Sequence, residues 1–216
     1  MNPYGWFFGL LFAVFFVYPS FACHPGSAVI LDENFKNPES GWGPADNVLS
    51  YGPSGVALKY APGAGLAAIN WHYTSDGADL CMTVIWPSSA ANEHTMGIIF
   101  WAKDYSNYYA AQFTNHGTIS VTRRIADTAR FLLLENDDKH PDLIHKDPGG
   151  TNEVEVQISG LKATMWVNGK KIFDIAGQPP FGSGYVGFFG SRSAAGDVSG
   201  DPPIMTIPKF MITTYP

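Results

Sequence analysis

The chain has 216 residues, of which 45% are hydrophobic and 15% charged, and its formal net charge is −6. This composition excludes an intrinsically disordered chain, and 23 glycines and 16 prolines spread without a period exclude a collagen-like repeat. Lys and Arg occur in runs no longer than a pair, so the sequence lacks the cationic face with which nucleic-acid-binding proteins neutralise phosphates.

Residues 1–22 have the pattern of a secretory signal peptide. The apolar run at residues 6–18 is too short to span a membrane comfortably. Ser20 and Ala22 supply the small residues found just before a cleavage point. We therefore expect a secreted or periplasmic protein with one domain over residues 23–216 and no remaining membrane span. An uncleaved N-terminal anchor is the alternative.

Cleavage after Ala22 makes Cys23 the first residue of the mature chain, and Cys81 is the only other cysteine. Exported chains meet oxidising conditions, which favours a Cys23–Cys81 disulfide. Two alternatives stay open. One is lipid attachment at Cys23, although Ser20 stands where bacterial lipobox sequences usually carry Leu. The other is a pair of free thiols.

From residue 28 onward, short apolar or aromatic runs alternate with turn residues, which is typical of strands. We expect strands at residues 29–31, 56–60, 66–71, 78–86, 96–102, 108–114, 118–125, 130–134, 153–159, 163–167, 171–175, 184–190 and 205–213. Asn168-Gly169 predicts a type I′ hairpin turn, and Asn115 to Gly117 predicts a second hairpin connection. No amphipathic helix is expected, so the pattern predicts an all-β, two-sheet antiparallel sandwich.

Three of these strands are apolar on both faces, namely residues 97–101, 108–113 and 184–190. Such a strand is either covered on both sides or lines a groove. A loop folded over the sheet would explain the pattern. An open, aromatic-lined face is the alternative, and that face would be the ligand site.

Four segments in this order resemble one group of proteins: DENFKNPESGW, GIIFWAKDYSNYYAAQF, NEVEVQISGLKATMWVNGKKI and GSGYVGFFGS. Together they resemble the concanavalin A-like lectin/glucanase superfamily, above all the laminin-G-like and keto-disaccharide-hydrolase-type jelly rolls of secreted bacterial proteins. The resemblance covers about residues 29–212 and implies a jelly roll. The superfamily mixes enzymes, lectins and accessory modules, so the resemblance implies no single activity. Many relatives carry Arg where this chain has Trp101.

The aromatic residues predict a sugar-binding site. Sugar rings present an apolar C–H face, which Trp and Tyr rings stack on, and a polar edge, which amide side chains bind. We expect the ligand site to comprise Trp101, Tyr105, Asn107, Tyr109 and Gln112. The expected role is therefore recognition of a glycan or related polyol without turnover.

Two other roles remain open. A glycoside hydrolase or lyase needs two carboxyl groups on either side of the scissile bond, and Glu153 and Glu155 share one face of a predicted strand. However, the E-x-D-x-x-E strand of jelly-roll glucanases has a third carboxylate where this chain has Ile158, so two solvated surface charges are the simpler interpretation. The third role is a structural or protein-interaction module of the envelope.

No cofactor is expected. Superfamily members often hold a structural Ca²⁺ near the chain ends, and Asp32 and Glu33 are the candidate ligands that this resemblance implies. The loop at residues 136–150 also gathers acids and histidines, but in no known metal-binding spacing. The G-x-G-x-x-G at residues 182–187 opens a predicted strand and not a helix, so it is not a dinucleotide motif.

Overall fold

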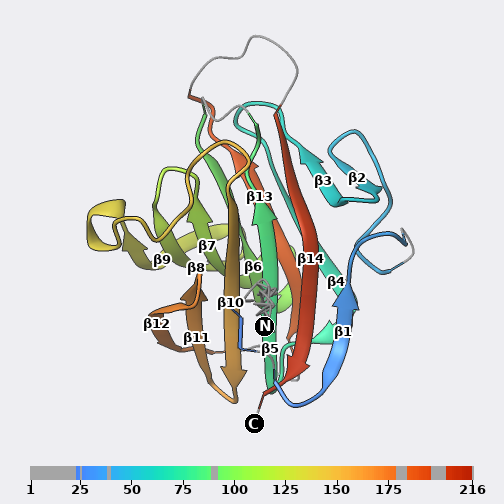
Figure 1. Ribbon diagram of the computed structural model, residues 1–216. Coiled ribbons are helices and arrows are strands. Elements are labelled where there is room, and N and C mark those ends of the chain that lie inside the picture. The colour runs from blue at the N-terminus through green and yellow to red at the C-terminus, as the bar shows by residue number, and fades with distance from the viewer. Residues whose placement is uncertain are drawn as a thin grey trace, which may run out of the picture.

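The structure is a computed structural model that describes residues 23–24, 26–37, 40–88, 92–178, 184–195 and 203–215. The predicted signal peptide lies outside these residues. Within them the chain forms fourteen strands and one short 3-10 helix, Asp137–Lys139. Every strand pairing is antiparallel, and the strands form two sheets that pack face to face (Figure 1). The prediction of an all-β, two-sheet sandwich is therefore confirmed.

Sheet A has eight strands in the order β12-β11-β10-β5-β14-β3-β2, and β1 joins it by pairing with β14. Its strands are β1 (Val29–Glu33), β2 (Leu49–Gly52), β3 (Gly55–Lys59), β5 (Ala78–Ile85), β10 (Thr151–Ser159), β11 (Lys162–Val167), β12 (Lys170–Ala176) and β14 (Ile204–Thr214). The sequence did not predict β2, which is short and follows a loop rich in turn residues.

Sheet B has six strands in the order β4-β13-β6-β7-β8-β9. Its strands are β4 (Gly65–Thr74), β6 (His94–Asp104), β7 (Asn107–Thr114), β8 (Ile119–Ile125), β9 (Thr128–Glu135) and β13 (Tyr185–Arg192). At the edge of this sheet, β9 has a β-bulge: Val121 and Thr122 of β8 oppose Leu133 and Phe131, and Leu132 is the extra residue between them.

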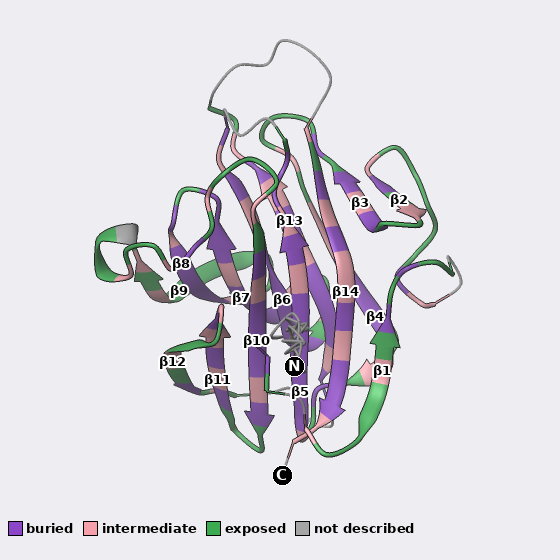
Figure 2. Ribbon diagram, in the orientation of Figure 1, coloured by how far each residue is buried: buried purple, intermediate pink, exposed green. Residues whose placement is uncertain are grey.

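The core lies between the sheets and follows the twofold alternation of the strands. In β10 the side chains of Val154, Val156 and Ile158 are buried, as their spacing predicts. Figure 2 shows this as purple bands along β10 and β14, whereas β1 at the margin of sheet A is largely exposed. Removing a large buried ring such as Phe188 from such a core typically costs about 3–5 kcal/mol.

The predicted turn at Asn168-Gly169 also has its expected backbone, because both residues have positive φ angles, 45° and 76°. It connects β11 to β12, and the Asn168 side chain anchors the turn by accepting a hydrogen bond from Glu153 N at 2.7 Å. Within the described ranges, no helix has the length and apolar character needed to cross a membrane.

Candidate functional site

The outer face of sheet B, which points away from the core, carries a second apolar cluster. Its buried members are Ile69, Ile99, Ala102, Tyr108 and Ala110, and Ala67, Tyr185 and Phe189 pack beside them. All of these residues come from β4, β13, β6 and β7. Each strand is thus covered by side chains of its neighbours in the same sheet, and within the described residues this cluster includes no loop. The pattern that is apolar on both faces therefore corresponds to a second apolar cluster on the outer face of sheet B.

Three aromatic rings stand together at one end of this outer face, and we call them the aromatic platform. The Trp71 ring lies edge-on to Tyr105 with centroids 5.6 Å apart, and edge-on to Tyr185 at 5.0 Å. Trp71 is 42% exposed and Tyr105 is 52% exposed, while Tyr185 is half-buried. Exposed rings in this number are unusual for a surface that serves no recognition.

The positions of the Trp71 and Tyr105 rings follow from the local structure of the chain around each of them. Trp71 lies two residues after Ile69, so alternation along β4 places it on the same outer face. Tyr105 lies in the tight turn between β6 and β7. There the Asp104 carboxylate accepts hydrogen bonds from Ser106 N at 2.9 Å and from Asn107 Nδ2 at 2.8 Å. The turn is thereby fixed, and the Tyr105 ring is held away from the core.

A polar hollow of about 360 Å³ opens at the other end of the same face. Most of its lining residues are Thr or Ser, and we call it the hydroxyl hollow. These residues are Thr95, Thr114, Thr118, Ser120, Ser191 and Ser193, and Gln112, Glu93 and Arg192 complete the polar lining. Phe131 and Leu134 of β9 form an exposed apolar wall on one side. A surface that combines hydroxyl and amide groups with an apolar wall can contact both the polar edge and the C–H face of a sugar.

The platform and the hollow belong to one continuous face. Tyr108, Ala110, Gln112 and Thr114 point outward in succession along β7, and each is paired across the sheet with an outward residue of a neighbouring strand. At about 3.3 Å per residue, the stretch from Tyr108 to Thr114 spans about 20 Å. The outer face therefore has the length to bind a chain ligand along the strands.

Two of the five predicted ligand residues lie at this surface. Tyr105 is part of the platform, and Gln112 lines the hollow, where its Nε2 donates a hydrogen bond to Thr122 Oγ1 at 3.0 Å. Asn107 has a different role, because its side chain bonds Asp104 and accepts a hydrogen bond from Ala126 N at 3.2 Å. It holds two turns together at the end of β7.

The other two predicted residues, Trp101 and Tyr109, do not present a ring to solvent. Each is 3% exposed, and both belong to the core cluster, with ring centroids 5.2 Å apart. Trp101 has a φ of 48° at an irregularity in the β6–β7 pairing. Its indole lies against Gly177, where a Cβ would overlap it. Alternation counted along β6 could not reveal this bulge, so the expectation that Trp101 and Tyr109 stack on a sugar is corrected.

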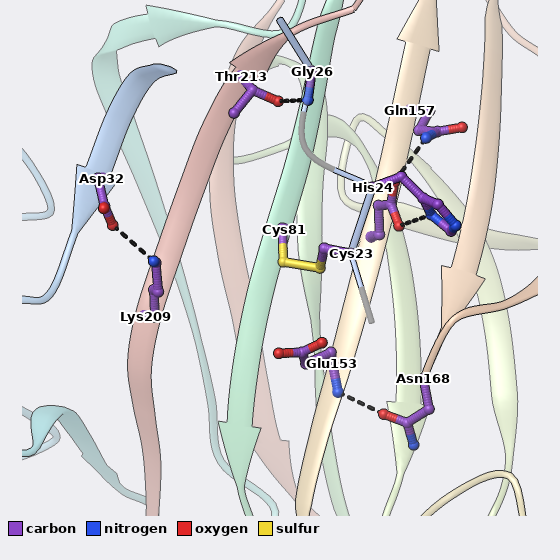
Figure 3. Close-up of a disulfide and its surroundings, with 11 residues drawn as sticks. Cys23, His24, Gly26, Asp32, Cys81, Glu153, Gln157, Asn168, Lys209 and Thr213 are labelled. Carbon is purple, nitrogen blue, oxygen red and sulfur yellow. Dashed lines mark hydrogen bonds and ion pairs between the residues drawn. A yellow bond between two sulfur atoms is a disulfide. The ribbon is translucent and has the colours of Figure 1, made fainter. Parts of the chain in front are cut away.

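The N-terminal segment covers the outer face of sheet A. Cys23 and Cys81 form a disulfide with Cα atoms 6.1 Å apart, which uses the thiol that a lipid would need (Figure 3). Next to it, His24 Nδ1 lies 2.9 Å from Glu155 Oε2, and the His24 ring packs on Trp166 with centroids 4.6 Å apart. This segment therefore covers the middle of β10.

The cover by His24 corrects the prediction that Glu153 and Glu155 are both solvated surface charges. Glu155 points outward from sheet A, as its spacing predicts, but it is only 2% exposed because His24 lies over it. Its Oε1 accepts a hydrogen bond from Gln157 Nε2 at 2.7 Å. Glu153 lies on the same face and is half-buried. A glycosidic oxygen cannot reach Glu155 in this arrangement, so the two residues do not form an accessible acid–base pair.

A third carboxyl group, Asp79 of β5, is buried beside Glu155 on the same face of sheet A. Asp79 pairs with Gln157 across the sheet and is therefore a diagonal neighbour of Glu155. Burial, reinforced by the negative charge of Glu155 and a hydrogen bond with it, raises the pKa of Asp79 to about 8. No N–H or O–H donor reaches the Asp79 oxygens within the described residues, so the protonated acid, which can itself donate to Glu155, is the favoured form.

The candidate calcium ligands do not form one site. Asp32 and Glu33 are adjacent in β1 and point to opposite faces. Asp32 pairs with Lys209 Nζ at 3.3 Å, whereas both Glu33 oxygens accept hydrogen bonds from Phe35 N and Trp42 Nε1. Over the described ranges, no three His, Cys, Asp or Glu residues are grouped so as to hold a metal ion.

In the loop before β10, the side chains of Lys139, His140 and His145 have protein partners. Lys139 and His140 both bond Glu135, at 2.9 Å and 2.6 Å. His145 Nδ1 lies 2.7 Å from the Thr151 carbonyl oxygen.

No family model matches the sequence, and no curated protein sequence matches it either. Solved structures do match its three-dimensional form. The carbohydrate-binding module CBM66 of Bacillus subtilis has a TM-score of 0.56 and 12% sequence identity, covering 81% of this chain and 96% of that one. The β-glucanase of Bacillus licheniformis has a TM-score of 0.57 and 9% identity, covering 88% and 99%. This chain has the concanavalin A-like jelly-roll fold.

The jelly rolls with this similarity include both binding modules and enzymes. A GlcNAcα1-4Gal-releasing endo-β-galactosidase of Clostridium perfringens also matches, with a TM-score of 0.54, 8% identity, and coverage of 86% of this chain and 62% of that one. At these identities the similarity establishes the fold alone.

Proposed function

We propose that this chain is an exported protein that binds a glycan or related polyol on the outer face of sheet B, without cleaving it. The observation that carries the proposal is the aromatic platform, in which Trp71 and Tyr105 are both substantially exposed and hold each other in place. The hydroxyl hollow extends the same face and offers polar partners for hydroxyl groups. The disulfide supports export, because such bonds persist in oxidising compartments.

Substitution of Trp71 tests the proposal. We expect Trp71→Ala to weaken glycan binding by about 10- to 100-fold in Kd, because stacking a sugar on an aromatic ring is worth about 1.5–3 kcal/mol of apolar burial. A glycan array identifies the ligand, and calorimetric titration then measures the affinities. The matched control is Leu161→Ala, which removes an exposed apolar side chain from the turn between β10 and β11. Equal affinities for the two variants would refute this binding face.

The hydrolase alternative is tested on the same glycans by assaying the release of reducing ends. We expect none from the wild-type protein, because Glu155 lies under His24 and is not accessible to a substrate. The control variant is Glu155→Gln. Release of reducing ends by the wild-type protein and not by Glu155→Gln would show that the chain is an enzyme.

A further inference from the structure

The two sheets leave a cleft between them at one side of the sandwich, and we call it the lateral cleft. Figure 1 shows its two borders on the same side of the molecule: β12, the edge strand of sheet A, and the β8–β9 edge of sheet B. Its volume is about 410 Å³, within the range of about 300–1,000 Å³ that is typical of small-molecule sites. Because it opens on the core side of sheet B, it is separate from the aromatic platform on the outer face.

Apolar side chains form much of the wall of the lateral cleft. Leu132 of β9 is 41% exposed there, and Phe173 and Ile175 contribute from β12. Alternation along β12 directs Phe173 and Ile175 to the core side, and Asp174 between them to the other face of sheet A. On that face the Asp174 carboxylate accepts a hydrogen bond from Thr164 Oγ1 at 2.8 Å. Among the described lining residues, the single acid therefore directs its charge away from the cleft.

A fixed cation stands on the opposite wall. Arg123 follows Val121 by two residues along β8, so alternation places it on the core side of sheet B with Tyr109. Its guanidinium lies over the Tyr109 ring at 5.4 Å, and its Nη2 donates a hydrogen bond to Gln178 Oε1 at 3.1 Å. Gln178 N in turn donates to Tyr109 Oη at 3.0 Å. The guanidinium is thus ordered before a ligand binds, which lowers the entropic cost of binding.

Arg123 carries a charge that the described residues leave unbalanced. Arg130 of β9 lies directly opposite it across the β8–β9 pairing, and like charges in that relation repel each other. Within the part of the chain that the structure describes, the side-chain partner of Arg123 is the neutral amide of Gln178, and neither arginine forms an ion pair with a carboxylate. An anionic group in the cleft would relieve this repulsion, and a guanidinium can bind a carboxylate through two parallel hydrogen bonds.

We propose that the lateral cleft binds a small organic acid with an apolar body, such as a medium-chain fatty acid or an arylalkanoic acid. The carboxylate pairs with the Arg123 guanidinium, and the apolar body packs on Leu132 and Phe173. A glycan fits this cleft poorly, because its hydroxyl groups would face apolar side chains without hydrogen-bond partners. The site is therefore independent of the proposed glycan-binding face.

Matched acids and amides test the inference in calorimetric titrations of the disulfide-bonded protein. We expect octanoate to bind about tenfold or more tightly than octanamide, because the carboxylate forms charge-assisted hydrogen bonds with Arg123. Acetate should bind more weakly than octanoate, since it lacks the apolar body. 3-Phenylpropanoate and its amide form a second pair, and the acid that binds more tightly identifies the body as alkyl or aromatic. Added salt should reduce the preference for the acids, because the cleft is open to solvent.

Variants link the preference to the cleft. Arg123→Gln should abolish the preference for octanoate and leave the affinity for octanamide unchanged. Arg123→Lys should keep part of the preference, because the charge remains and the paired hydrogen bonds are lost. The matched control is Arg124→Gln, the next residue of the same strand, whose side chain lies on the outer face over Tyr108. Thermal unfolding establishes that each variant is folded. Equal binding of acids and amides, or a preference that survives in Arg123→Gln, overturns the inference.

NMR locates the bound acid. Octanoate should shift the side-chain signals of Arg123 and the main-chain amide signals of Phe173 and Ile175, and leave the Trp71 indole signal of the aromatic platform in place. Leu132→Ala, at an exposed position, should weaken octanoate and octanamide by the same factor, because both place their apolar body there. Octanoate that shifts the Trp71 signal instead would overturn the inference. Glycan binding is detected at Trp71 and acid binding at Arg123, so either proposal can fail while the other stands.

Discussion

Loss of the disulfide should lower the free energy of unfolding by about 4 kcal/mol, because the Cys23–Cys81 bond joins residues 58 positions apart in the sequence and restricts the unfolded chain accordingly. The suitable variant replaces both cysteines with Ser, so that no free thiol remains. Urea denaturation measured with and without a reducing agent gives the change in stability.

The reducing agent provides an internal control for this experiment. It should destabilise the wild-type protein by about the same amount and have no effect on the double variant. Lys171→Gln, on the exposed edge strand β12, should change the stability little, because exposed ion pairs such as Lys171–Asp174 contribute little. A double variant as stable as the wild-type protein would mean that the covering segment adds nothing to the fold.

Asp79→Asn should stabilise the protein at neutral and alkaline pH by a few kcal/mol. Burial next to Glu155 raises the pKa of Asp79 from 3.8 to about 8. The folded protein therefore holds a proton that the unfolded chain releases. The resulting stabilisation is fully present below about pH 4 and is lost as the pH rises to about 8. Asn is neutral at every pH and can donate to Glu155 as the protonated acid does.

The measurement is the urea midpoint of both proteins at pH 4 and at pH 9. We expect nearly equal midpoints at pH 4 and a clearly higher midpoint for Asp79→Asn at pH 9. The matched control is Asp174→Asn on the surface of β12, where Lys171 and Thr164 lower the pKa of the carboxyl. That substitution should give no gain at pH 9. A wild-type midpoint that stays level from pH 4 to pH 9 would contradict the buried acid.

The fold could be predicted because the strands obey a local rule. The alternation of Val154, Val156 and Ile158 is present in the sequence, and so is the Asn168-Gly169 turn. The rule also holds on the outer face of sheet B, where Trp71 follows Ile69 at the same spacing. A count of outward positions along β4 could therefore have identified Trp71 as a platform residue.

The remaining features depend on contacts between distant segments. The burial of Trp101 results from a positive φ and from the close approach of Gly177, and neither leaves a mark in the residues around Trp101. Glu155 has the spacing of an outward-facing side chain, but the disulfide brings His24 over it from far away in the sequence. Periodicity predicts the direction in which a side chain points, and it cannot predict what covers it.

The bulge at Leu132 lies in β9, the edge strand of sheet B. The last strand of sheet B displays Phe131, Leu132 and Leu134 beside unpaired main-chain groups, a combination that invites further strands to add and build fibrils. The extra residue breaks the regular spacing of those groups, so an incoming strand cannot stay in register along the rim. We therefore expect deletion of Leu132 to make the protein more prone to add strands at this edge and polymerise.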